Sequence, residues 1–382
     1  MLLILAVLGG LHYLLFPSYY MKDFGYGDSG SSLRLSVYTE WAEKYGPTIE
    51  PEERAELDGQ LETEKVLFAE QLTLLPFAAE QGITDWESFQ AFREARVYGK
   101  GDMEMERVFW TTVENTNYFR IDAIGEAIDH YDGLAENRPP NLNYDGGDPP
   151  ALTARKLARI KEIKASDMVH GYIPTVVFSC AGYVSRYFTV WSLLSVVLFL
   201  SPTLVRDRLR RTRQLQWSSR MGRRVLKTQI LAAELSAFGL WIINLAAYGI
   251  PFLAQHPLIF QDFRLFEFIT FSIPWYNWSF GVYLLILAGL VLILSLATAG
   301  FTVFLSQYSG HYIAMLLKAV PLFAALAWLC SKMIISRAFL FGNPLSELTG
   351  LPGAEFAAIL ILAVLSAALI VVACRQQRLR EL

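Results

Sequence analysis

The chain has 382 residues, of which 53% are hydrophobic and only 18% are charged. Soluble domains average about 25% charged residues, so this composition indicates a membrane protein. The net charge of -3 conceals an asymmetry: acidic residues crowd residues 23–167, whereas basic residues gather at 205–227 and after Cys374. The three cysteines lie in or beside apolar segments without C-x-x-C spacing, which argues against a disulfide framework and a zinc site.

The first apolar run, residues 2–16, ends at Pro17. It is short for a membrane span, which needs about 20 residues. A signal peptide is the alternative, but its basic start and small-residue cleavage site are not visible. We predict a first transmembrane helix over residues 1–17, and we expect its cytoplasmic start to be missing from this sequence.

Residues 18–170 are polar, and their apolar positions recur at helical spacing, which predicts a separate helical domain. Pro51 and the acids after it predict a helix start. Thr84 and Glu87 are spaced as a capping box, with Thr84 as the N-cap. One helix is expected over about 103–131, and an amphipathic helix is expected near 152–165.

Five further apolar segments follow, and with the first helix they give about six transmembrane helices. Their predicted cores are residues 187–204, 228–252, 281–305, 313–335 and 356–373. The expected fold class is therefore an all-α polytopic membrane protein, with a helical extracytoplasmic domain at 18–170 and a membrane domain at 171–382. The aromatic residues that crowd 253–280 suit a membrane-interface belt better than an aromatic ligand cage.

The loop at 205–227 carries eight arginines and one lysine against one acid. A short basic loop between spans stays on the cytoplasmic side. A nucleic-acid patch is the alternative, but a basic arm between two spans has little room to reach a duplex. Counting spans from this loop places residues 18–170 outside and the arginine-containing tail after Cys374 in the cytoplasm. We therefore expect a multi-pass protein of the cell membrane.

Short strings before and within this loop, together with the six spans and the large outside domain, resemble an ABC-2 type transporter permease of the subgroup with a large extracellular insertion. The strings are Leu200-Ser201-Pro202, Arg206-Asp207-Arg208, Leu215-Gln216-Trp217-Ser218-Ser219 and Gly222-Arg223-Arg224. Two positions depart from the family pattern. Asp207 stands where Glu is usual, and Thr212 follows Arg211 rather than a glycine.

The resemblance implies that a separate ABC ATPase subunit docks on the loop and that a second permease subunit, the same or related, joins the complex. Leu215 and Trp217 among arginines would offer an apolar anchor within a polar rim; simple positive-inside charge is the alternative. The expected docking residues are Asp207, Thr212, Leu215, Trp217, Ser218, Ser219, Gly222 and Arg223.

The chain has no phosphate-binding loop with the glycine, lysine and hydroxyl spacing of an ATPase, so ATP is expected on the partner and no cofactor on this chain. Its histidines lack paired-ligand spacing, and no nucleophile elbow occurs, so we do not expect an enzyme. The expected function is the permease subunit of an ATP-driven exporter in the lipid bilayer, without a nucleic-acid partner. The alternative is a membrane-anchored sensor whose outside domain binds a ligand.

Two ionisable residues lie within predicted spans. Glu234 and Lys318 have similar expected depths, and they form a candidate intramembrane polar pair or line a path. Snorkelling toward the headgroups is the alternative. Ser295, Ala299 and Gly300 give their span a small-residue face, which predicts close helix packing and suggests a subunit contact.

Overall fold

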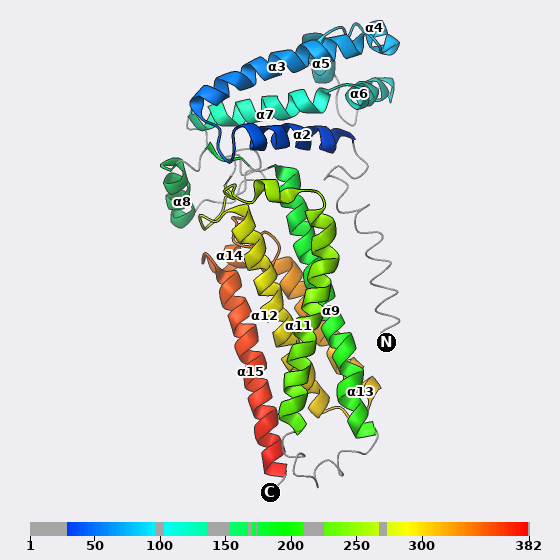
Figure 1. Cartoon of the computed structure of the whole chain (residues 1–382), viewed down its shortest axis with the longest axis vertical. Helices are drawn as coiled ribbons and strands as arrows, with labels where there is room; N and C mark the ends of the chain where they lie inside the picture. The colour runs from blue at the N-terminus through cyan, green and yellow to red at the C-terminus, as the bar shows by residue number, and fades with distance from the viewer. Residues whose placement is uncertain are drawn as a thin grey trace.

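The computed structural model describes residues 29–95, 103–135, 153–166, 170–172, 174–209, 225–266 and 273–380. The expected first span at 1–17 lies outside these residues. The described chain has two layers: a group of helices lies across one end of a bundle of long apolar helices (Figure 1). We call the first layer (residues 29–135) the head domain and the second the span bundle. The two ends of the bundle are the head end and the loop end.

The head domain is helical, as predicted. It consists of α2 (Ser29–Lys44), α3 (Pro51–Leu72), α4 (Pro76–Glu80), α5 (Trp86–Ala95), α6 (Met103–Asn115) and α7 (Tyr118–Ala135). Helices α2, α3 and α7 pack together, and a second apolar core forms where α3 meets α4, α5 and α6. Phe68, Phe89 and Phe109 lie at the centre of this second core.

The helix predicted over 103–131 is in fact two helices, α6 and α7. They separate at Thr116 and Asn117, where contacts with α3 replace helical hydrogen bonds. The Asn117 backbone N–H donates to Gln71 Oε1 at 2.7 Å, and Asn117 Nδ2 donates to the Glu64 carbonyl oxygen at 2.8 Å. An asparagine side chain competes well with helical hydrogen bonds, so it favours a break at this position.

The predicted capping box is displaced by one residue. The Ser88 backbone N–H donates to Asp85 Oδ1 at 2.8 Å, and the Asp85 backbone N–H donates to Ser88 Oγ at 3.0 Å. Asp85 therefore caps α5 in place of Thr84, and Ser88 takes the role assigned to Glu87. The Asp85 carboxylate accepts bonds from the Ser88 backbone N–H and from the Ser88 hydroxyl in its charged form, which lowers the pKa of Asp85.

The span bundle contains α9 (Thr175–Leu209), α11 (Val225–Leu253), α12 (Phe280–Gln307), α13 (Tyr312–Trp328) and α15 (Ala354–Arg380). A π-helical segment, η5 (Leu329–Ile334), extends α13. In the described chain, five helical stretches are long and apolar enough to cross a membrane, at 177–205, 225–253, 280–307, 312–334 and 354–376. The five predicted spans are confirmed, and the first of them begins ten residues earlier than its predicted core.

Helix α12 is central, because it packs against α9, α11 and α15. Its small residues Ser295, Ala299 and Gly300 are in the protein interior, and the Ser366 Oγ of α15 donates to the Ala297 carbonyl at 2.8 Å. The predicted close packing is therefore present. The small-residue face lies against helices of the same chain, so it is not free for a subunit contact.

Aromatic rings join the head domain to the span bundle. The Trp41 ring of α2 meets Tyr172 edge to face at 6.0 Å between centroids, and Tyr172 meets Phe263 at 5.0 Å. Phe260, Phe263 and Phe266 are buried in protein. The prediction of a membrane-interface belt is therefore wrong for these three rings, which form part of the protein core.

Candidate functional site

The predicted docking loop connects α9 and α11, which pack against each other. Asp207 lies in the last turn of α9. The other expected docking residues, Thr212, Leu215, Trp217, Ser218, Ser219, Gly222 and Arg223, lie outside the described residues. Leu200 and Leu226 are buried in one apolar cluster at the base of the loop. This cluster fixes the two helix ends from which the loop departs.

The candidate polar pair lies on helices that both pack against α9. Lys318 on α13 donates to the Tyr308 carbonyl at 2.6 Å, so its charge lies at the C-terminal end of α12, where a cation is favourable. Glu234 on α11 is half-buried beside Ala233 and Ala237. No hydrogen bond or ion pair joins Glu234 to Lys318 in the part of the chain that the structure describes, so their pairing remains a prediction.

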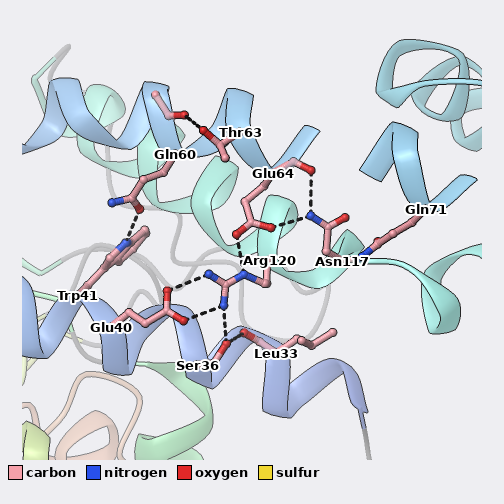
Figure 2. A network of polar contacts seen from close by, with 11 residues as sticks. Leu33, Ser36, Glu40, Trp41, Gln60, Thr63, Glu64, Gln71, Asn117 and Arg120 are labelled. Carbon is pink, nitrogen blue, oxygen red and sulfur yellow. Dashed lines mark hydrogen bonds and ion pairs between the residues drawn. The ribbon is translucent and has the colours of Figure 1, made fainter. Parts of the chain in front are cut away.

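A charged network in the head domain was not predicted. Figure 2 shows Arg120 of α7 between carboxylates of α2 and α3. Its Nε donates to Glu64 Oε1 at 2.7 Å, its Nη2 donates to Glu40 Oε2 at 2.8 Å, and its Nη1 reaches Ser36 Oγ at 2.8 Å. One guanidinium thereby connects three helices.

The charged side chains of this network are paired with one another. Hydrogen bonds from Arg120 hold the pKa of the Glu40 carboxyl below its ordinary value of 4.5. A polar cavity of about 570 Å³ lies beside the network, and Lys44 and Glu56, which pair with each other, also line it. Because these charges already have protein partners, the cavity has the features of a structural junction rather than a ligand site.

The second feature that was not predicted is the set of contacts made by α8 (Ala154–Lys164), which lies at the head end of the span bundle (Figure 1). Lys156 and Arg159 are only 4% and 7% exposed, and they share one face with the buried Ile163. The amphipathic helix predicted at 152–165 is therefore present, but its packed face carries two cations.

These cations contact two separate connections between the spans. Arg159 Nε donates to the Pro274 carbonyl at 2.9 Å, and the same guanidinium donates to the Asn277 side chain. Lys156 pairs with Glu347 of α14 (Pro344–Thr349). Helix α8 thus attaches both the connection before α12 and the connection before α15, and we call this set of contacts the α8 clamp.

The connection before α15 is held in a strained conformation. Arg337 and Phe339 have backbone φ values of 50° and 64°, which residues other than glycine rarely adopt. The Phe339 backbone N–H donates to Glu355 Oε1 at 3.1 Å, and Glu355 is buried in the first turn of α15. The strain and the buried carboxylate indicate that this turn is tightly specified by its surroundings.

Within the described residues, no group of three or more His, Cys, Asp or Glu side chains is arranged to hold a metal ion. Comparison with protein-family models, with curated proteins and with solved structures finds no match for this chain. The fold defines the class: an α-helical membrane protein with a helical head domain. Among the described residues, the head domain contacts the span bundle where α2 meets the connection after α11, beside Tyr172 just before α9.

Proposed function

We propose that this chain is the membrane-spanning permease subunit of an ATP-driven ABC exporter. A separate ATPase subunit would dock on the loop at 205–227, and a second permease subunit would complete the complex. The observation that carries the proposal is the length of α9, a single helix from Thr175, three residues after the head-domain contact Tyr172, to Leu209 within the basic loop. A displacement of the loop would reach the head domain through one helix.

The positions of the two basic clusters support the proposed orientation. The end of α9, the start of α11 and the C-terminal end of α15 lie at the same end of the span bundle (Figure 1). The basic stretches that adjoin these helix ends in the sequence, at 206–224 and 375–380, would then share one side, which the positive-inside tendency assigns to the cytoplasm. The acidic head domain would then lie outside the cell membrane.

The exposed helix faces supply a place for the second permease subunit. Helix α11 exposes Leu231, Leu235 and Ile243, and α15 exposes Leu360 and Val364. In a membrane these faces contact lipid or another span. Closure of two ATPases on ATP would move the docking loops, and a path would open where the two permease subunits meet.

The docking loop gives the direct test. Leu215→Asp and Trp217→Asp place a charge in the expected apolar anchor, and each should weaken ATPase binding about thirtyfold, as for an interface hot spot. The measurement is recovery of ATPase with the full-length protein from detergent-solubilised native membranes, together with stimulation of ATP hydrolysis. Protein abundance in the membrane should not change.

The matched control is Leu74→Asp in the head domain, where Leu74 is 77% exposed. This variant replaces a leucine by aspartate, as Leu215→Asp does, but in another domain. ATPase recovery with this variant should equal that with the wild type. Normal recovery with both loop variants would overturn the docking assignment. Intact wild-type protein that arrives without any ATPase would overturn the exporter and favour a membrane-anchored sensor.

A further inference from the structure

A second cavity lies between three spans at the head end of the bundle. Its volume is about 550 Å³, within the usual range for small-molecule sites. Helices α9, α11 and α12 form its walls, and the connection that follows α11 covers the head side. Phe188, Leu245, Phe252, Leu284 and Leu287 contribute to a lining that is mainly apolar.

The cavity opens toward the membrane rather than toward the chain interior. Leu285 is 75% exposed, and Leu253, Leu258 and Val282 at the rim are also exposed. Leu253, Val282 and Leu285 belong to stretches that are long and apolar enough to span a bilayer. A molecule that occupies this cavity can therefore enter sideways from the hydrocarbon.

One end of the cavity is polar. Gln261, Asp262 and Ser279 lie together at the head end, where the connection after α11 meets the start of α12. The Gly281 N–H donates to the Gln261 carbonyl at 2.8 Å, which fixes this end. Asp262 is the one charged side chain in the described lining, and it has no ion-pair or hydrogen-bond partner among the described residues. The nearby Arg264 instead donates to the Asn277 carbonyl at 3.1 Å.

We propose that this cavity is a binding site for a cationic amphiphile taken from the membrane. Its alkyl chain would lie among the apolar side chains of α9, α11 and α12, and its ammonium head would lie beside Asp262. An apolar tail is favoured by the lining, and a positive head is favoured by Coulomb attraction to the exposed Asp262 carboxylate at the polar end. This site lies within one chain, so it does not depend on an ATPase or on a second permease subunit.

Glycines on α11 provide a matched pair of variants. A side chain added at Gly249 or at Gly239 would start in open space. Gly249 lines the cavity and Gly239 does not. Gly249→Phe should fill the cavity, whereas Gly239→Phe places the same ring on the same helix away from it.

The probe is tetradecyltrimethylammonium with a diazirine on its chain, added to the full-length protein in phosphatidylethanolamine nanodiscs. Photolabel should concentrate on 248–253 and 281–288, and unlabelled tetradecyltrimethylammonium should compete for it. Gly249→Phe should remove this label, and Gly239→Phe should retain it. A tetradecyl sulfate probe and the Asp262→Asn variant with the cationic probe should each give about tenfold less label, the size expected for loss of one favourable charge contact.

A tetradecanol probe separates the two parts of the site, since Asp262→Asn should leave its labelling unchanged. Equal labelling by the sulfate and ammonium probes would overturn the assignment of a cationic head. Label spread evenly over the exposed faces of α11 and α15, and insensitive to Gly249→Phe, would show bulk membrane partitioning and overturn the site itself. ATPase recovery is not part of this assay, so failure here leaves the proposed exporter untouched, and the reverse also holds.

Discussion

The head domain and the span bundle satisfy their polar side chains in different ways. In the head domain the least exposed arginines have partners on other helices: Arg120 joins α7 to α2 and α3, and Arg54 of α3 pairs with Asp132 of α7 at 2.6 Å. In the span bundle most partners lie one turn back on the same helix. Ser201 donates to the Val197 carbonyl at 2.6 Å, and Thr298 donates to the Leu294 carbonyl at 2.8 Å.

The difference follows from the surroundings of the two regions. A polar group in hydrocarbon has no water to bond with, so a bond to its own helix satisfies it before the helices meet. The spans then associate mainly by close packing, with few bonds between helices, such as Asn244 Nδ2 to Ser195 Oγ at 3.0 Å. Charged contacts should therefore determine stability in the head domain, and steric fit should determine it in the span bundle.

The largest effect is expected from removal of the head-domain cation. Arg120→Ala leaves Glu64, which is 14% exposed, without its ion-pair partner, and should destabilise the α2–α3–α7 packing by about 3 kcal/mol. Hydrogen exchange of α2 and α7 amides in the full-length protein should become about a hundredfold faster. Arg107→Ala is the control, because Arg107 pairs only with Glu104 one turn away on the surface. Similar acceleration in both variants would refute a special role for the network.

The second effect tests steric fit in the span bundle. A side chain at Gly300 would overlap Ser366 and Ile370 of α15, so Gly300→Val should separate α12 from α15 at a cost of about 2 kcal/mol. Thermal unfolding in detergent should shift to lower temperature, and exchange should rise in α15 and not in the head domain. Gly289→Val places the same residue on α12 in open space and should behave as wild type. An equal drop in unfolding temperature in both variants would show that the helix propensity of valine, rather than the contact with α15, causes the effect.

The smallest effect concerns pH. Arg120 lowers the pKa of Glu40 in the folded state, so the charged contact contributes stability above the unfolded value of about 4.5 and loses it as the pH falls below that value. The protection factors of head-domain amides, which remove the intrinsic pH dependence of exchange, should fall as the pH drops below about 4.5, and Glu40→Gln should make this fall shallower. Glu43→Gln, at an exposed position of the same helix, is the control variant for the substitution itself. If Glu40→Gln left the pH dependence of head-domain protection unchanged, other groups would control the acid sensitivity.

The sequence predicted the five described spans well, because long apolar runs leave few alternatives to a membrane helix. It also predicted that the domain before them is helical. Local details were less accurate. Asp85 rather than Thr84 caps α5, and Asn117 divides one expected helix into two, because its partners Glu64 and Gln71 come from a helix far away in sequence.

The contacts of α8 show why the α8 clamp could not be predicted from the sequence. Lys156 and Arg159 are cations in a helix that looks surface-exposed, and their partners lie 191 and 115 residues further along the chain, at Glu347 and Pro274. One local signal was available: Lys156, Arg159 and Ile163 recur at helical spacing and share a face. The amphiphile cavity had no comparable signal, since three separate spans and a connection build it.

The length of α9 has a mechanical consequence. Its 35 residues span about 50 Å, and Pro202 lies close to the loop end. Proline is where a helix bends most readily, and a bend of about 5° there would displace the far end of α9 by about 3.5 Å. Tyr172 lies just before α9 and packs against Trp41 of α2, so such a displacement would act on the head domain at this contact. Pro202 would then act as the pivot of a lever arm beside the basic loop, and a small movement at that end would become a larger one at the head end.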